Sequence, residues 1–289
     1  MLLMFGIGED GKMARESALA IHFIFGFLLA TLITSSSIAR DINNGTALTI
    51  LSKPVNRSSY VLSKFFGIAL VIVIYSMICL CSSLISERIS EHFQMSATAF
   101  GYITDWQTAQ IALSAISASL LLASVINYKT KALFSSIAFW LLPAALLATI
   151  LICSFFERNG NAGSFDMRLD LRIVPVSILI TLGLIVLASI STTLSTRLSP
   201  VLSTILTFMI FTAGLVSPQV FADNQATHDI WSIAYRFLPG WQTFWTSEAL
   251  TANGTVPWSY VMHTASYAFY YASGVLILGI FSFRSIDLK

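Results

Sequence analysis

The sequence predicts an all-α protein, a polytopic bundle of about seven transmembrane helices. Hydrophobic residues make up 56% of its 289 residues and charged residues only 10%. A soluble domain carries roughly 25% charged residues, because its surface must face water. The mean hydropathy of +0.78 points the same way. These observations exclude a water-soluble fold.

Seven stretches are long and apolar enough to span a bilayer. The hydrocarbon core of a membrane is about 30 Å thick and needs about 20 apolar helical residues, with every backbone polar group bonded internally. The stretches are 18–39, 65–85, 106–126, 132–155, 173–193, 198–216 and 259–283. None of them contains Asp, Glu, Lys or Arg, so every charged residue falls in a connection.

The connections alternate between the two sides of the membrane, and their charge orients the chain. Nine of the sixteen Lys and Arg residues lie on one side, in short connections close to the ends of the stretches. Those connections are 40–64, 127–131, the turn at Arg197 and the tail 284–289. Because Lys and Arg concentrate on the cytoplasmic side, we expect the C-terminus in the cytoplasm and, with seven spans, Met1 outside.

The cytoplasmic connection 40–64 has the pattern of a folded element. Residues 46–51 can form a short helix with one apolar face. Pro54 disfavours helix at the residue before it, so the chain should turn there. A second helix can begin at Ser58 and continue into the next span. The result is a bent element with exposed apolar and basic residues, suited to docking a soluble partner; the alternative is a solvated connection.

This connection resembles that of a known family. Along the chain it contains an acidic residue, then Gly-Thr, Leu-Ser-x-Pro-Val-x-Arg and Lys. This pattern resembles the cytoplasmic loop of permease subunits of ABC-2 type transporters. In that family the loop carries a coupling helix that sits on the ATP-binding subunit. The resemblance implies a coupling role for the matching residues, which are Asp41, Gly45, Thr46, Leu51, Ser52, Pro54, Val55, Arg57 and Lys64.

The resemblance covers residues 1–85 and 189–289, with two departures from the family. The family usually has six spans, beginning with a cytoplasmic amphipathic helix and a first span. This chain starts after both, so we expect an upstream helix and one further span, eight in all; the alternatives are seven genuine spans or a miscounted one. The second departure is an additional pair of spans, 106–126 and 132–155.

The connection 217–258 is the longest and is rich in aromatic residues. One interpretation is an outer gate over the substrate path, formed by Phe237, Pro239, Trp241 and Phe244. The other is anchoring at the membrane interface, where aromatic rings commonly lie. The resemblance implies short re-entrant helices in this region.

Catalytic motifs are missing from the sequence. Nothing matches the nucleotide-binding loop Gly-x-x-x-x-Gly-Lys-Ser/Thr, Gly-x-Ser-x-Gly or His-Glu-x-x-His. His22 and His263 lie in spans without a carboxylate or second histidine at helical spacing, so packing or pore lining is favoured over a proton relay or metal binding. The net charge of +2 and the lack of a basic run exclude nucleic acid as a partner. We therefore expect no enzyme activity, metal or cofactor in this chain.

Together these observations predict the membrane subunit of an ABC-2 type exporter. Residues 1–289 would form one permease domain in the cell (inner) membrane, paired with a second permease chain as a homodimer. By resemblance, a separate ATPase would bind ATP and Mg²⁺. The alternatives are an ATP-independent secondary carrier, which would want an intramembrane acid, and a lipid-modifying membrane enzyme, which would want clustered polar residues. Uncharged spans favour an amphipathic or lipid-like cargo.

Overall fold

The structure of the protein is a computed structural model. It describes residues 11–43, 56–90, 92–95, 100–156, 169–221, 238–246, 250 and 254–284. Within these, six helices are long and apolar enough to cross a membrane. The all-α transmembrane bundle predicted from the sequence is confirmed.

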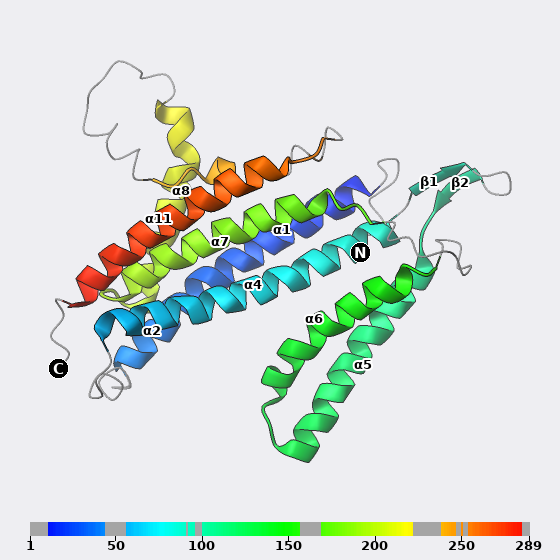
Figure 1. The fold of residues 1–289 in the computed structure, drawn as a ribbon, viewed down its shortest axis with the longest axis horizontal. Helices are drawn as coiled ribbons and strands as arrows, with labels where there is room; N and C mark the ends of the chain where they lie inside the picture. Colours follow the sequence, from blue (N-terminus) through cyan, green and yellow to red (C-terminus); the bar gives the residue numbers. More distant parts are fainter. Residues whose placement is uncertain are drawn as a thin grey trace. The chain divides into compact units, whose positions relative to one another are not determined.

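The helices follow the predicted stretches closely (Figure 1). They are α1 (Lys12–Leu28), α2 (Thr34–Asn43), α4 (Arg57–Ile89), α5 (Trp106–Thr130), α6 (Phe134–Cys153), α7 (Ile173–Ser195), α8 (Pro200–Phe221) and α11 (Trp258–Arg284). A π-helical turn, η2 (Leu29–Ile33), joins α1 to α2, and a single 3-10 turn, η3 (Trp241–Thr243), follows α8. The apolar part Pro200–Val216 of α8 is shorter than the other six spans.

Two features differ from the predicted elements. The first span begins at Lys12 rather than residue 18, so it includes Arg15. After α4, where the sequence suggested only a connection, strands β1 (His92–Met95) and β2 (Phe100–Ile103) form an antiparallel hairpin with His92 opposite Ile103.

The described residues group into two compact units. The first consists of Met1–His22, Ile74–Ser177 and Leu250–Asn253, and the second of Phe23–Val73, Ile178–Ala249 and Gly254–Lys289. Helices α1, α4 and α7 each contribute residues to both units.

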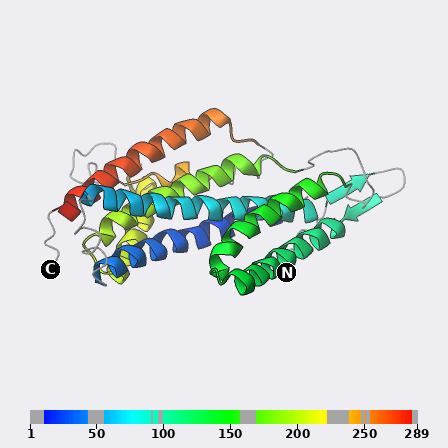
Figure 2. The same ribbon diagram turned by 60° about the horizontal axis from the view of Figure 1, so that its bottom comes forward.

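In the first unit, α5 and α6 form an antiparallel helical hairpin (Figure 2). The Asp105 carboxylate caps the start of α5 by accepting a hydrogen bond of 2.8 Å from the backbone N–H of Thr108. Lys131 ends the helix in the left-handed conformation, with φ of 59°, and its N–H donates to the Asn127 carbonyl at 2.9 Å. These terminal signals define the length of α5.

A buried ion pair joins the helix ends of the first unit. Arg88, near the end of α4, lies 3.2 Å from the Asp105 carboxylate, and both side chains are almost fully buried. Arg88 also donates to the carbonyls of Cys153 at 2.7 Å and Phe156 at 2.8 Å. Carbonyls at a helix C-terminus lack partners within the helix, so the guanidinium caps α6 as well as neutralising Asp105.

In the second unit, α7 is packed against α11, and the two views show them side by side (Figures 1 and 2). Leu184 and Leu187 of α7 are fully buried. The Thr193 hydroxyl donates to the Val275 carbonyl at 2.9 Å, and a methyl group at Gly279 would lie 2.7 Å from the same hydroxyl oxygen. Glycine, which lacks a Cβ, therefore permits this close approach at position 279.

Buried hydroxyls link η2 and α2 to α7 and α8 in the second unit. The hydroxyls of Ser35 and Thr204 lie 3.0 Å apart, and those of Ser195 and Ser203 lie 2.8 Å apart. Ser191 donates to the carbonyl of Thr31 at 3.3 Å. Hydrogen bonds between helices of this kind contribute to association in lipid, where apolar surfaces gain little from contacting one another.

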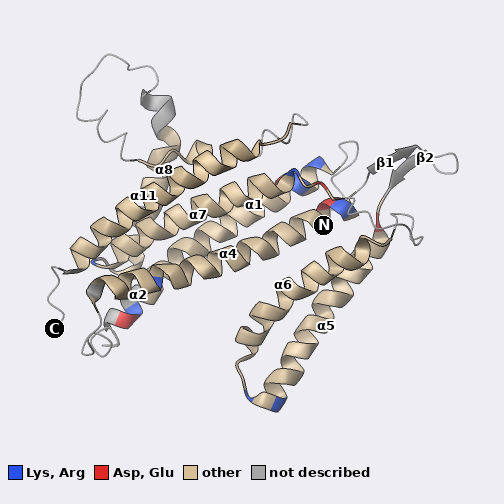
Figure 3. Cartoon of the chain, in the orientation of Figure 1, with Lys and Arg blue, Asp and Glu red and all other residues tan. Residues whose placement is uncertain are grey.

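The charged residues lie at the ends of the helices, and the lengths between them are uncharged (Figure 3). Large apolar side chains are exposed along those lengths, including Phe66 and Leu70 on α4 and Phe269 on α11. In a membrane these side chains face lipid, so their exposure is expected.

Candidate functional site

The two ends of the predicted coupling connection meet at one carboxylate. Asp41 lies in the last turn of α2, and Tyr60 and Lys64 lie in the first two turns of α4. The Tyr60 hydroxyl donates to Asp41 Oδ2 at 2.9 Å, and Lys64 Nζ lies 2.5 Å from the same atom. Tyr60 and Lys64 are four residues apart on one helix face, so both reach a single acceptor.

A third helix joins this contact. The ring of Tyr60 stacks on Phe283, near the end of α11, with ring centroids 5.7 Å apart and an interplanar angle of 21°. Both side chains are buried. We call Asp41, Tyr60, Lys64 and Phe283 the Asp41 clamp, because they hold the ends of α2, α4 and α11 together.

The structure locates part of the predicted coupling set. It brings Asp41 and Lys64 together, and it starts α4 at Arg57, one residue before the predicted Ser58. The side chain of Arg57 and the residues Gly45, Thr46, Leu51, Ser52, Pro54 and Val55 lie outside the described part, as does the short helix predicted at 46–51. Tyr60 was not in the predicted set, although its spacing from Lys64 places both on one face.

The described part of the predicted outer gate comprises Pro239, Trp241 and Phe244, whereas Phe237 lies outside it. Trp241 begins the 3-10 turn η3, and Trp241 and Phe244 are buried. The backbone N–H of Gly240 donates to the hydroxyl of Tyr267 on α11 at 3.1 Å. The turn is therefore attached to α11, and its two aromatic rings, Trp241 and Phe244, are buried within the second unit.

Two glycines make room for these rings. A methyl group at Gly183 of α7 would lie 3.2 Å from Phe244 Cβ. A methyl group at Gly214 of α8 would lie 2.5 Å from Trp241 Nε1 and 2.8 Å from the Pro239 carbonyl oxygen. Any larger residue at 214 would force the turn away from α8.

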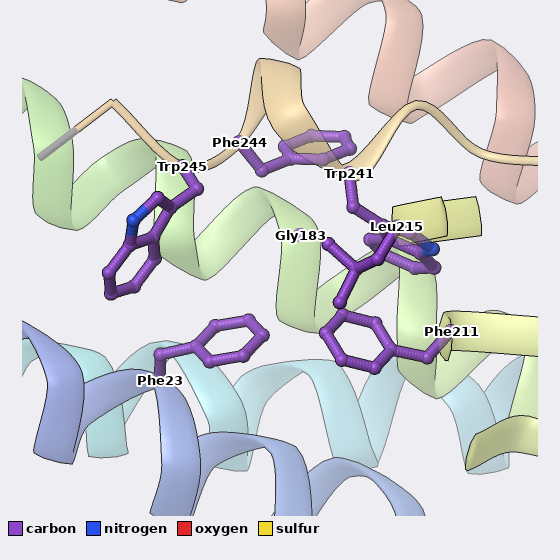
Figure 4. A pocket seen from close by; sticks show the side chains of 7 residues that line it. All are labelled: Phe23, Gly183, Phe211, Leu215, Trp241, Phe244 and Trp245. Atoms are coloured by element: carbon purple, nitrogen blue, oxygen red, sulfur yellow. The ribbon is translucent and has the colours of Figure 1, made fainter. Parts of the chain in front are cut away.

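Beneath the turn lies an aromatic cavity of about 250 Å³ (Figure 4). Its lining residues are Phe23, Gly183, Phe211, Leu215, Trp241, Phe244 and Trp245. The rings contact one another, with centroids 5.5 Å apart for Phe23 and Trp245 and 5.2 Å apart for Phe211 and Trp241. All of these residues belong to the second unit, and none of them is charged.

A second cavity of about 510 Å³ shares Phe23 and Phe211 with the first. Its other lining residues are Ile24, Phe27, Leu28, Thr31, Thr204, Ile205 and Phe208. We call the two together the aromatic pocket. Among the residues that line the larger cavity, the only polar side chains are those of Thr31 and Thr204, and the Thr31 hydroxyl is already bonded to the Phe27 carbonyl at 2.9 Å.

The partners of several buried polar residues could not be identified from the sequence. His22 is fully buried, with Nε2 3.0 Å from the Ser76 hydroxyl and Nδ1 3.4 Å from that of Ser177. These hydroxyls come from α4 and α7, so no search at helical spacing along one helix could find them. The contacts agree with the packing role that the sequence favoured for His22.

A second missed contact lies at the start of α1. Arg15 forms a buried ion pair of 2.7 Å with Asp170, which Arg172 also contacts at 2.8 Å. Burial raises the pKa of the Asp170 carboxyl, but hydrogen bonds from Arg172 and the charges of both arginines outweigh it and hold that pKa below its usual value. This partner explains why the first span can begin at Lys12.

Comparison with known proteins supports the family suggested by the loop. Residues 8–143 match the family model described as an ABC-2 family transporter protein. No curated protein and no solved structure matches the chain. The matched segment contains the whole connection 40–64 and extends through α5 into α6, so it includes part of the helix pair regarded above as additional. This match and the six span-length helices support a multi-pass membrane protein that is similar to ABC-2 family transporter proteins over residues 8–143.

Proposed function

We propose that this permease is the membrane subunit of an ATP-driven exporter in the cell (inner) membrane. In this proposal the connection 40–64 docks on a separate ATPase, which binds ATP and Mg²⁺, and a second copy of the permease completes the complex. The family match supports the transport role. The observation that carries the coupling proposal is the Asp41 clamp, which anchors both ends of the connection.

The clamp provides a route by which movement of the connection reaches the spans. A displacement of the segment between Asp41 and Lys64 pulls on α2 and α4 together, because one carboxylate binds both ends. The stack of Tyr60 on Phe283 extends the displacement to α11. ATP binding would then shift the equilibrium between two arrangements of the spans. The shift can be no larger than the difference in binding free energy of ATP for the two arrangements.

The two alternative functions receive less support. A proton- or sodium-coupled carrier is expected to have an acidic residue within its spans, and the seven apolar stretches contain no Asp or Glu. A lipid-modifying enzyme is expected to cluster catalytic polar groups at one depth. His22 has only serine hydroxyls as side-chain hydrogen-bond partners in the described residues, which gives it no charged catalytic partner.

The coupling proposal is tested by changing the connection and measuring ATP hydrolysis. The permease is co-purified with its ATPase from native membranes, and substrate-stimulated hydrolysis is compared at equal complex yield. Pro54→Leu and Arg57→Glu should lower stimulation, because the sequence predicts a bend at Pro54 and places Arg57 beside the predicted apolar face. Lys129→Glu is the matched charge reversal, at an exposed position in another connection predicted to be cytoplasmic.

The clamp itself is tested by the double variant Asp41→Asn with Tyr60→Phe. It removes the ion pair and the tyrosine hydroxyl while keeping the aromatic stack. We expect the ATPase to remain bound while stimulation falls. Unchanged stimulation in all three connection and clamp variants would contradict the coupling role, as would an equal loss in Lys129→Glu.

A further inference from the structure

We infer that the exposed face of α11 is the surface on which a second copy of this chain packs within the membrane. The inference rests on the second copy named in the proposed function, and it assigns the contact between the copies to one helix face. We call this surface the Tyr270 face. Its residues are all exposed, and they are His263, Ser266, Tyr270, Gly274, Ile277 and Phe281.

The spacing of these residues places them on one side of α11. They follow one another at intervals of three or four residues, the spacing at which side chains share a helix face. The opposite side, which includes Val261, Ala268, Ala272 and Leu276, is buried within the second unit. Figure 2 shows α11 at the edge of that unit. The helix therefore packs on its own unit through one side and leaves the Tyr270 face exposed.

Polar groups on this face lie at membrane depth. Tyr270 is 74% exposed and lies near the middle of α11, about 18 Å from Trp258 and about 21 Å from Arg284 along the helix axis. Within the part of the chain that the structure describes, neither its hydroxyl nor the imidazole of His263 has a hydrogen-bond partner. A polar group placed in hydrocarbon without a partner is costly. Lipid is therefore a poor neighbour for this face.

The exposed surfaces of other spans do not share this feature. Every exposed side chain of α1, and of α8 up to Val216, is apolar. The exposed serines Ser114, Ser117 and Ser124 of α5 donate to carbonyls of their own helix at 2.8–2.9 Å, which a tyrosine hydroxyl cannot reach. Helix α11 is the least apolar of the six span-length helices, although fewer than a third of the residues in its most apolar stretch are buried. Its exposed polarity therefore calls for a protein partner.

The chemistry of the face suits a second copy of the same chain. In a two-fold dimer one surface meets itself, so each group must pair with its own kind. Hydroxyls and neutral imidazoles carry both a donor and an acceptor, so Tyr270 and His263 satisfy this condition. Both copies dock an ATPase on the cytoplasmic side in the proposed function, so equal residues meet at equal depth. The face carries no charge, and two copies of it meet without repulsion.

The apolar residues of the face argue against the competing explanation, a water-filled path. Ile277 and Phe281 lie on the same side as Tyr270 and are each more than half exposed, so a path lined by this face would wet them. Protein interfaces combine apolar and aromatic contacts with a few hydrogen bonds, as this face does. At Gly274 an added Cβ would meet no atom within 4 Å, so the backbone of a partner helix can come close there.

The test is disulfide cross-linking of the chain in native membranes, together with its ATPase. Serine replaces the three native cysteines, single cysteines are introduced, and copper–phenanthroline oxidises thiols that meet. His263→Cys and Tyr270→Cys should give dimers on denaturing gels. Phe269→Cys is the matched control, because Phe269 is 69% exposed on the same helix but points about 100° away from Tyr270. Equal dimer yield at Phe269→Cys, or rapid reaction of Tyr270→Cys with a membrane-impermeant thiol reagent, would overturn the inference.

Gly274→Leu tests the packing of the two copies without new contacts within one copy. It should lower the dimer yield of Tyr270→Cys roughly 5-fold or more, the effect of overpacking a close contact. Gly67→Leu on α4 is the matched control, because Gly67 is also exposed and an added Cβ there meets no atom within 4 Å. Gly274→Ala should keep the dimer, since alanine still permits close helix packing. Equal yields for the two leucine variants would contradict the assigned surface.

The number of copies in the complex separates this inference from the proposed function. Native mass spectrometry of the unchanged complex with its ATPase counts them. A single copy would contradict the proposed dimer and this surface together. Two copies without cross-links at His263→Cys and Tyr270→Cys would leave the dimer standing and overturn the Tyr270 face alone. Coupling is scored independently by the Pro54 and Arg57 variants.

Discussion

A methyl group on Gly214 would lie 2.5 Å from the indole Nε1 of Trp241, closer than real Cβ atoms approach other atoms. The Pro239 carbonyl oxygen, at 2.8 Å from the same point, is backbone and cannot rotate away. The position of the turn that carries Trp241 therefore depends on a glycine in α8, and this dependence can be measured.

The first prediction is that Gly214→Ala destabilises the protein by about 1–3 kcal/mol, the usual cost of overpacking. The melting temperature in detergent should fall. Gly274→Ala is the matched control, because a methyl group there meets no atom within 4 Å. It should leave the melting temperature unchanged or raise it slightly, since alanine favours helix over glycine. Equal melting temperatures for both variants would contradict the close approach.

The second prediction concerns the buried pair of Arg88 and Asp105. Arg88→Met leaves a buried carboxylate without its cation and should cost about 3–5 kcal/mol. Arg88→Met with Asp105→Asn removes both charges and keeps an oxygen that can cap Thr108, so it should recover much of the loss. Monodisperse yield in size-exclusion chromatography with fluorescence detection measures this. Lys129→Met, at an exposed cation, is the control and should behave as the unchanged protein. Failure of the double variant to exceed Arg88→Met would argue against a charge pair.

The third prediction is a pH dependence from Asp170. Its folded-state pKa lies below the usual value of about 3.9. A group of this kind stabilises the fold above its unfolded-state pKa, and the stabilisation is lost as pH falls through the folded-state pKa. The difference in melting temperature between the unchanged protein and Asp170→Asn should be constant from about pH 5 to 8 and shrink below about pH 4. A difference that grows on acidification would contradict the ion pair with Arg15.

The fourth prediction is the orientation of the chain. In a background in which Cys79, Cys81 and Cys153 are replaced by serine, single cysteines are tested with a membrane-impermeant thiol reagent in intact cells. Cysteines at Ser59 and Lys129 should remain unlabelled. Cysteines at Asn161 and Asn224 should be labelled. All four should react after the membrane is permeabilised, which controls for local accessibility. The opposite pattern would invert the proposed sides and remove the coupling role of 40–64.

The positions of the spans could be predicted from the sequence because the membrane imposes one requirement on every spanning residue. A helix of about 20 uncharged residues satisfies it, and the signal is local in the chain. The early start of α1 could not be predicted, since Arg15 is tolerated there through Asp170, which lies 155 positions away. The hairpin β1–β2 could not be predicted from the sequence, because two four-residue strands give almost no periodic signal.

The candidate sites also combine residues that could be predicted from local sequence with contacts that depend on the fold. Asp41 and Lys64 could be identified from a loop pattern, because resemblance to a family is detected from the order of residues along the chain. Their meeting through Tyr60 and Phe283 depends on how three helices pack. Trp241 and Phe244 drew attention as aromatics in a long connection. The cavity beneath them depends on Gly183 and Gly214, which are ordinary small residues until the fold brings the rings against them.

The π-helical turn η2 has a consequence for how this span can change length. A π turn holds one more residue than an α turn, and the surplus residue is confined to it. On one side of the turn Phe27 meets Phe211, with ring centroids 5.0 Å apart, and on the other Ser35 meets Thr204. Loss of one residue within Leu29–Ile33 would close the turn to α geometry and keep both pairs facing their partners. Elsewhere in a span, the same deletion rotates everything beyond it by about 100°.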